Sequence, residues 1–282
     1  MVNDPLSDLG LASGVLLWQA IALSVLSLGA GVLGGAVGLA LGTIRLPFML
    51  LAGMPPAAAG GTNILVSTLS SGTGSIGHLR AQRVEWRAVL VQGGPAVLGA
   101  IAGGFAASAA PERLLIGLAG GFVLWQSVEL VQRARRMVNS SISGTRTDGP
   151  GTSLASFTRP RIVLEGAVGL GIGIVGGAVG LILGTLRLPM LMRILRLDPR
   201  VAAGTNLVIG TFLGVAGWLG HATTGSVDYP MLVIMGSLAM VGTVIGTRLT
   251  GSLSLPALLR LMSIVLGMVS ILLLARAFGI TG

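Results

Sequence analysis

Hydrophobic residues in this chain form long, nearly unbroken runs. Each run is long enough to cross the roughly 30 Å hydrocarbon core of a membrane as a helix. Strands of a membrane barrel would instead alternate apolar and polar residues. The pattern therefore predicts an all-α polytopic membrane protein. The eight long runs cover residues 14–44, 58–78, 88–108, 112–132, 162–186, 201–220, 230–251 and 256–275.

The runs repeat along the chain. Residues 34–50, GGAVGLALGTIRLPFML, return at 176–192 as GGAVGLILGTLRLPMLM, with 12 of 17 positions identical. Further along the chain, matching motifs are spaced 143 residues apart. We therefore predict two homologous repeats, residues 1–138 and 161–282. Residues 139–160, rich in Ser, Gly and Thr, read as a flexible cytoplasmic linker.

Each repeat also contains a short apolar segment, at 46–53 and 188–194. At 1.5 Å per residue such a segment spans about 12 Å, less than half a membrane. Pro47 and Pro189 punctuate these segments, and proline interrupts helices because it has no N–H to donate. Each repeat is thus expected to hold four long helices plus a half-helix or broken segment. Whether the short segments cross the membrane is left open.

Arginine placement bears on how the repeats are oriented. The loop 79–87 holds three arginines and its counterpart 222–230 holds none, whereas 193–200 holds three and its counterpart 51–57 holds none. Because positive loops stay in the cytoplasm, this opposite bias favours inverted repeats. Four passes per half, with the repeats parallel, is the alternative.

Composition narrows the function classes. Only 10% of residues are charged and there is no cysteine, which excludes a soluble domain, a disulfide framework and a thiolate metal site. All 18 basic residues are arginine, and the net charge of +9 reads as membrane topology rather than nucleic-acid binding. The carboxylates, Glu165 among them, are expected in loops or near span ends. We therefore expect no buried carboxylate relay, no enzyme activity and no metal site.

Arg45 and Arg187 are the leading candidates for function. Each lies two residues before a proline, within apolar sequence. An arginine near the middle of a membrane costs roughly 2.5–3.5 kcal/mol on insertion scales, so such residues usually face a cavity and serve a function. The alternative is that they reach the membrane interface or bond free carbonyls at a helix break.

A Gly-Thr-Asn motif also occurs in both repeats, at Gly61, Thr62 and Asn63 and at Gly204, Thr205 and Asn206. It is expected early in a helix, where free N–H groups and a partial positive charge suit anions. Close helix packing by the glycines is the alternative.

The two histidines, His78 and His221, occupy equivalent positions at the expected ends of helices. A coupling or gating role is one reading, because histidine titrates near neutral pH. A histidine at the membrane interface is the other.

Three elements in order resemble the sulfite exporter TauE/SafE family. They are a glycine-rich stretch ending in Pro47, an Ala-x-Gly-Thr element at 59–62, and a basic loop closing on Val84-Glu85-Trp86; all recur in the second repeat. The resemblance implies secondary transport of sulfite, organosulfonates or related oxyanions across the bacterial inner membrane. It implies an aliphatic residue where Arg45 and Arg187 stand, so these positions are where this chain departs from the family.

We therefore expect a multi-pass inner-membrane transporter that moves a small sulfur-containing oxyanion by alternating access. The two helix breaks should meet, with both arginines and the Thr-Asn pairs binding one anion. No cofactor is expected; coupling to H⁺ or Na⁺ and a homodimer are left open. The alternative is an anion channel or a cation-coupled permease for another small solute.

Overall fold

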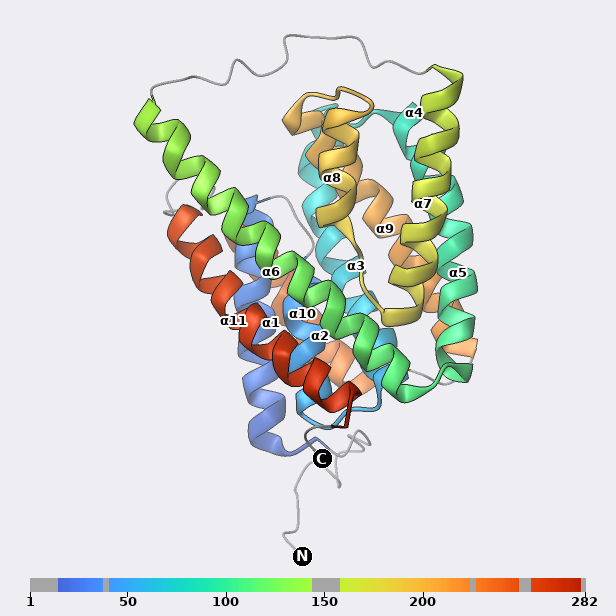
Figure 1. Cartoon of the computed structure of the whole chain (residues 1–282), viewed down its shortest axis with the longest axis vertical. Helices are drawn as coiled ribbons and strands as arrows, with labels where there is room; N and C mark the ends of the chain where they lie inside the picture. Colours follow the sequence, from blue (N-terminus) through green and yellow to red (C-terminus); the bar gives the residue numbers. More distant parts are fainter. Residues whose placement is uncertain (1–14, 38–40, 144–157, 224–226, 249–254, 280–282) are drawn as a thin grey trace, which may run out of the picture.

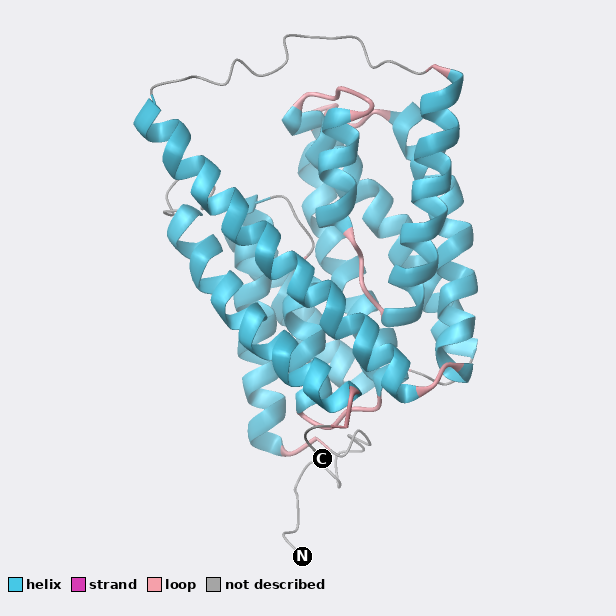
Figure 2. Ribbon diagram, viewed as in Figure 1, coloured by secondary structure: helices cyan, strands magenta, loops and turns pink. Residues whose placement is uncertain are grey.

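The computed structural model describes residues 15–37, 41–143, 158–223, 227–248 and 255–279. All regular structure in these residues is helical (Figure 2). In chain order the elements are α1 (Leu17–Val37), α2 (Gly42–Leu51), α3 (Pro56–Arg80), α4 (Trp86–Ala88), the π-helix η1 (Val89–Gly93), α5 (Gly94–Ala109), α6 (Glu112–Ser143), α7 (Arg159–Val179), α8 (Gly184–Arg193), α9 (Pro199–Thr223), α10 (Tyr229–Arg248) and α11 (Leu255–Ala277).

Six of the described helical segments are long and apolar enough to cross a membrane. The 25-residue α3 is not among them, because it carries Thr, Asn and Ser side chains along much of its length. Most of those side chains are buried inside the protein. The predicted polytopic helical fold is confirmed, and large apolar side chains such as Trp18, Val163 and Val233 remain exposed on its outer surface, as lipid contact requires.

The helix breaks do not fall at the prolines. Pro47 and Pro189 lie inside α2 and α8, so their assignment as the helix breaks is wrong. In the second repeat the break comes earlier because Gly180 ends α7 in a left-handed conformation, with φ of +76°. A left-handed turn favours glycine, since other side chains clash there. The short helices are 10 residues each, about 15 Å long.

The boundary after the first repeat also shifts. α6 continues to Ser143, so the beginning of the expected linker is helical, and α7 already begins at Arg159. The remainder of that linker, residues 144–157, lies outside the described residues.

The two halves interlock. The first helix of each half packs along the fourth of the other half: α1 along α10, and α7 along η1 and α5. α6 packs along α11, and α3 crosses α9 at the centre (Figure 1). α1 begins at the end of the molecule where α11 ends, whereas its counterpart α7 begins at the opposite end (Figure 1).

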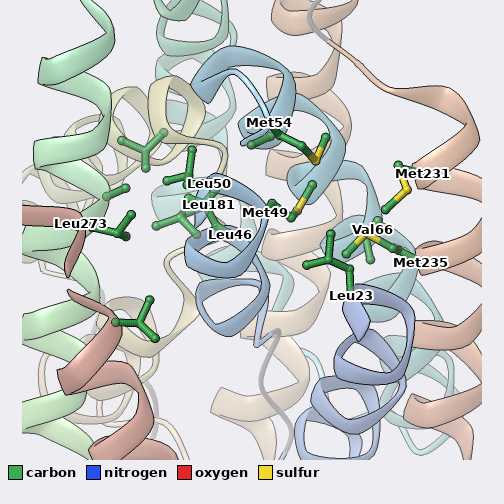
Figure 3. Packing of buried hydrophobic residues seen from close by; sticks show 14 of the residues in the cluster. Leu23, Leu46, Met49, Leu50, Met54, Val66, Leu181, Met231, Met235 and Leu273 are labelled. Carbon is green, nitrogen blue, oxygen red and sulfur yellow. The ribbon is translucent and has the colours of Figure 1, made fainter. Parts of the chain in front are cut away.

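A hydrophobic core surrounds the short helix α2. Leu46, Met49 and Leu50 of α2 are buried together with Leu181, which follows α7, and Leu273 of α11 (Figure 3). Burying these side chains holds α2, and the arginine that it carries, inside the protein.

Candidate functional site

The Arg45 side chain lies inside the protein, where α2 meets α3. It is 1% exposed. Its Nε donates to Asn63 Oδ1 at 3.4 Å, and its Nη2 donates to Ser67 Oγ at 2.8 Å. Asn63 in turn donates through Nδ2 to the carbonyl oxygen of Gly180, at 2.9 Å. Arg45 is therefore linked, through Asn63, to the end of α7 in the other half.

Arg187 occupies the equivalent place where α8 meets α9. It is fully buried, and its Nε donates to Asn206 Oδ1 at 3.1 Å. Its Nη1 and Nη2 have no hydrogen-bond partner. In the described part of the chain no carboxylate pairs with Arg187. A buried guanidinium with unsatisfied N–H groups is costly, and an anionic acceptor would satisfy those groups.

The difference between the two arginines comes from one position. Ser67, which accepts from Arg45, corresponds in the second repeat to Gly210. A Cβ placed on Gly210 would lie 3.3 Å from Arg187 Nη2 and 3.4 Å from Ser71 Oγ. Gly210 thus offers no polar side chain to Arg187 Nη2. The nearest other side-chain atoms are Ile182 Cγ2 and the buried hydroxyl of Ser71, which also has no partner.

A small cavity lies beside Arg45, lined mainly by α1, α3 and α10. Ser70, Ser71 and His78 of the first half line it together with Leu207 and Thr243 of the second half. Its volume is about 20 Å³, which leaves room for one or two water molecules. A sulfur atom with three oxygens does not fit, so anion binding requires the surrounding helices to separate.

Thr62 and Thr205 act at a different place from the arginines. Thr62 Oγ1 accepts from the backbone N–H of Asp228, and Thr205 Oγ1 accepts from that of Glu85, both at 2.9 Å. Glu85 and Asp228 also cap the helices that follow them. Each threonine therefore fastens the helix start of the opposite half, and the structure does not bring either hydroxyl to an arginine.

Gly204 of the second Gly-Thr-Asn motif is a packing position. A Cβ on Gly204 would collide with the carbonyl oxygen of Arg83 in the other half. α3 and α9 begin at Pro56 and Pro199, so Gly61 and Gly204 lie in the second turn. The expectation of free N–H groups at these motifs is wrong, since N–H groups beyond the first turn are paired within the helix.

The helix starts nearest the arginines are instead those of α2 and α8. Their cap residues are Leu41 and Leu183, and neither contributes a side-chain hydrogen bond to the helix start. The backbone N–H groups of these first turns add partial positive charge to that of the guanidinium groups.

The histidines differ from each other. His221 is buried, and its Nε2 lies 2.8 Å from the carbonyl oxygen of Gly177, which ties the end of α9 to α7. His78 is only partly buried and borders the cavity beside Arg45. Neither the coupling nor the gating role is tested by this arrangement.

Three buried serines of α3 were missed by the sequence reasoning. Ser67, Ser71 and Ser75 follow the predicted Asn63 along one face of α3 at intervals of four residues. That spacing was a usable signal, because residues four apart share one helix face. Glu165 was expected near a span end, but it is fully buried within α7.

Comparisons with known proteins agree with this architecture. The family profile described as sulfite exporter TauE/SafE matches residues 23–274. A probable membrane transporter protein of Bacillus subtilis, YdhB, is 27% identical over 206 residues, covering 71% of this chain and 78% of that protein. Another, YunE, is 23% identical over 261 residues, covering 87% and 94%. No solved structure matches the chain.

The family match spans nearly the whole chain and includes both arginine sites and both threonine contacts. The helical fold, the apolar outer surface and the relatives' description as membrane transporters are mutually consistent. The chain is therefore a multi-pass membrane transporter of the bacterial inner membrane that belongs to the sulfite exporter TauE/SafE family.

Proposed function

We propose that this protein carries a sulfur-containing oxyanion, such as sulfite or an organosulfonate, across the membrane by alternating access. The observation that supports this most is Arg187, a fully buried guanidinium with two nitrogens that have no acceptor. Planar guanidinium groups bind oxyanions through paired N–H donors. An anion at this place would supply both the missing acceptors and the missing negative charge.

Arg45 adds a second positive charge at the related position. With Asn63 and Ser67 already bound, it contributes mainly charge, whereas Arg187 contributes charge and free donors. Ser71, between the Arg45 cavity and Arg187 Nη2, offers a further hydroxyl. The anion site is thus proposed from Arg187, Arg45, Asn63, Asn206 and Ser71, without the two threonines.

The repeats are proposed to be inverted. α1 and α7 begin at opposite ends of the molecule, and α2 and α8 follow them back towards those ends (Figure 1). The arginine-bearing segments 81–85 and 194–198 lie at one end, together with the end of α6 and the start of α7 (Figure 1). Such clustering is what cytoplasmic loops require. Inverted repeats permit alternating access, because exchanging their conformations opens the site to the other side.

A carrier is favoured over a channel by the small cavity. About 20 Å³ beside Arg45 admits water and not an oxyanion, so the described conformation is closed around the site. A carrier passes through such a closed state in every cycle.

Transport into liposomes tests the proposal directly. Purified protein is expected to take up sulfite or methanesulfonate with saturating kinetics, and each anion is expected to raise the melting temperature of the protein, since a ligand that binds the folded state stabilises it. The variant Arg45→Gln/Arg187→Gln keeps polar side chains but no charge and should show neither effect. Equal uptake by this variant would contradict the site, and non-saturating anion currents would indicate a channel.

A further inference from the structure

A second buried ionisable group lies away from the arginines. Glu165 is the seventh residue of α7, about 9 Å along the helix from Arg159, and it is fully buried. Its Oε2 accepts a hydrogen bond from Gln92 Nε2 at 2.6 Å, while its Oε1 has no partner. An ionisable side chain inside a membrane-spanning helix is expensive and usually has a function.

Gln92 is held by an unusual piece of backbone. It is part of η1, a single stretch of π-helix between α4 and α5, and it is fully buried. Its Oε1 has no partner, so the pair has an unpaired oxygen on each residue. π-helical turns are rare and often occur at functional sites, because they cost stability that a plain α-helix would not.

The equivalent interface in the other half shows that the fold does not need this polar pair. Repeat alignment places Leu23 of α1 opposite Glu165, and Met235 of α10 opposite Gln92. Leu23 and Met235 are buried in one hydrophobic cluster (Figure 3), and α10 is α-helical where η1 is π-helical. The α1–α10 interface thus packs with apolar side chains alone, and it avoids the free-energy cost of burying a carboxyl and an amide group.

Within the described part of the chain, no charged side chain pairs with Glu165. Arg161 lies one turn earlier on the same face of α7, yet no ion pair joins the two in the described residues. α5 carries no charged residue, Arg87 of α4 is exposed, and His221 of α9 is bound to Gly177, three turns further along α7. The charged residues at the start of α6, Glu112 and Arg113, are exposed as well.

The π-helix that carries Gln92 packs against α9, the helix that contributes Asn206 to the proposed anion site. η1 lies against α9: Val89 clusters with Val208 and Ile209, and a Cβ on Gly93 would lie 3.2 Å from Ile209 Cγ1. Ile209 precedes Gly210, the residue beside Arg187 Nη2. Just before η1, the Glu85 N–H is bound by Thr205, next to Asn206. A movement of η1 would therefore reach α9, whose Asn206 accepts a hydrogen bond from Arg187.

We propose that Glu165, held by Gln92, is the site of a proton that is co-transported with the anion; this rests on the proposed function of the arginine site. The proton binds at Oε1, while Oε2 keeps its hydrogen bond from Gln92. It is bound and released once per cycle without any change in covalent bonds, so no further reactant is needed.

The sign of the coupling follows from charge. Protonation of Glu165 removes one negative charge from the protein interior and so strengthens the attraction of Arg187 and Arg45 for an anion. By linkage, anion binding must then favour protonation to the same degree. The wild-type protein is expected to bind methanesulfonate about tenfold more tightly at acidic than at neutral pH. Methanesulfonate keeps its single charge over this range, which removes titration of the ligand as a cause.

The decisive experiment measures anion uptake and proton movement together in liposomes that contain a pH-sensitive dye. An inward methanesulfonate gradient should drive protons inward through the wild type, and an inward proton gradient should speed uptake. Glu165→Gln mimics the protonated side chain; it should bind methanesulfonate at every pH as tightly as the wild type does at acidic pH, and move no protons.

The double variant Glu165→Leu/Gln92→Met separates coupling from structure, because it installs the apolar pair that the chain already uses at residues 23 and 235. Replacing a buried polar pair by well-packed apolar residues is usually neutral or stabilising. This variant should therefore fold with an unchanged or higher melting temperature and lose proton movement. Glu112→Gln, which removes an exposed carboxylate, serves as the control and should keep proton movement.

The outcomes are distinguishable. Wild-type anion uptake without proton movement, or proton movement that persists in Glu165→Gln, would overturn the inference while leaving the proposed function intact. Absence of any oxyanion uptake by the wild type would overturn the proposed function and this inference with it.

Discussion

Arg45 and Arg187 stand in two almost identical stretches of sequence, but their surroundings differ. Arg45 has protein partners at Nε and at Nη2, whereas Arg187 has one at Nε only. The cause is a single substitution between the repeats, Ser67 against Gly210. The two copies of the site therefore differ in their free hydrogen-bond donors. The Arg45 guanidinium is bound by protein side chains at two nitrogens, whereas Arg187 keeps two nitrogens without a protein partner, where a ligand could bind.

The largest difference between the repeats is expected when the charge of Arg187 or of Arg45 is removed and anion binding is measured. Arg187→Gln is expected to weaken anion binding by at least about 100-fold, because two charge-assisted hydrogen bonds and one charge are lost together. Arg45→Gln should weaken it less, since only charge is lost there. The rise in melting temperature with methanesulfonate, measured for both variants, shows which variant loses more binding. Equal losses of binding would show that both arginines contact the anion.

Exchanging Ser67 and Gly210 between the repeats should show whether these two positions cause the difference in anion affinity between Arg45 and Arg187. Gly210→Ser places a hydroxyl beside Arg187 Nη2 and should lower anion affinity about tenfold by occupying one donor. The new Cβ would meet Ile182 Cγ2 at 3.1 Å, so a small shift of that side chain is needed. Ser67→Gly frees Arg45 Nη2, and combining both changes should transfer the dominant role to Arg45.

A dissociation constant that is unchanged in Gly210→Ser would contradict the role given to Arg187 Nη2. Gly214→Ser is not a suitable control, because a Cβ there would collide with Thr68 Oγ1. Ser237→Gly, which removes an exposed hydroxyl bound only within its own helix, controls for a general effect of such exchanges.

The two asparagines should differ in their effect on stability. Asn63 accepts from Arg45 and donates to Gly180 in the other half, whereas Asn206 has its contact with Arg187. Asn63→Ala should therefore lower the free energy of unfolding by about 1–3 kcal/mol, and Asn206→Ala by less. The melting temperatures of the two variants in the same detergent test this; a larger loss for Asn206→Ala would contradict it.

The smallest effects are expected at the threonines. Thr62→Val and Thr205→Val each remove one hydrogen bond to the opposite half, worth about 0.6–1 kcal/mol inside a membrane protein. Both variants should melt at a slightly lower temperature and bind methanesulfonate as the wild type does. A loss of methanesulfonate binding comparable to that of Arg187→Gln would indicate that the threonine hydroxyls do belong to the anion site.

Sequence reasoning located the two arginines and both asparagines because the duplication marked them. It misplaced the helix breaks because it assigned them to the prolines, whereas in the second repeat the glycine at position 180 ends α7 and Pro189 lies inside the ten-residue α8. It also assigned the threonines to the anion site, because the pairing of Thr62 with Asp228 joins residues 166 positions apart and only the fold reveals it. Glu165 was judged by its distance from the helix start rather than by the face it occupies.

The interlocking of the halves has a consequence for how the chain came to be. α1 finds its partner in α10, and α7 in η1 and α5, so a single half made alone would expose one long helix without its neighbour. Two separate copies could supply that neighbour to each other, and inverted halves would require the copies to enter the membrane in opposite directions. Fusion of two such genes would then join helices that already pair, and the two fragments should still assemble when the chain is cut between α6 and α7.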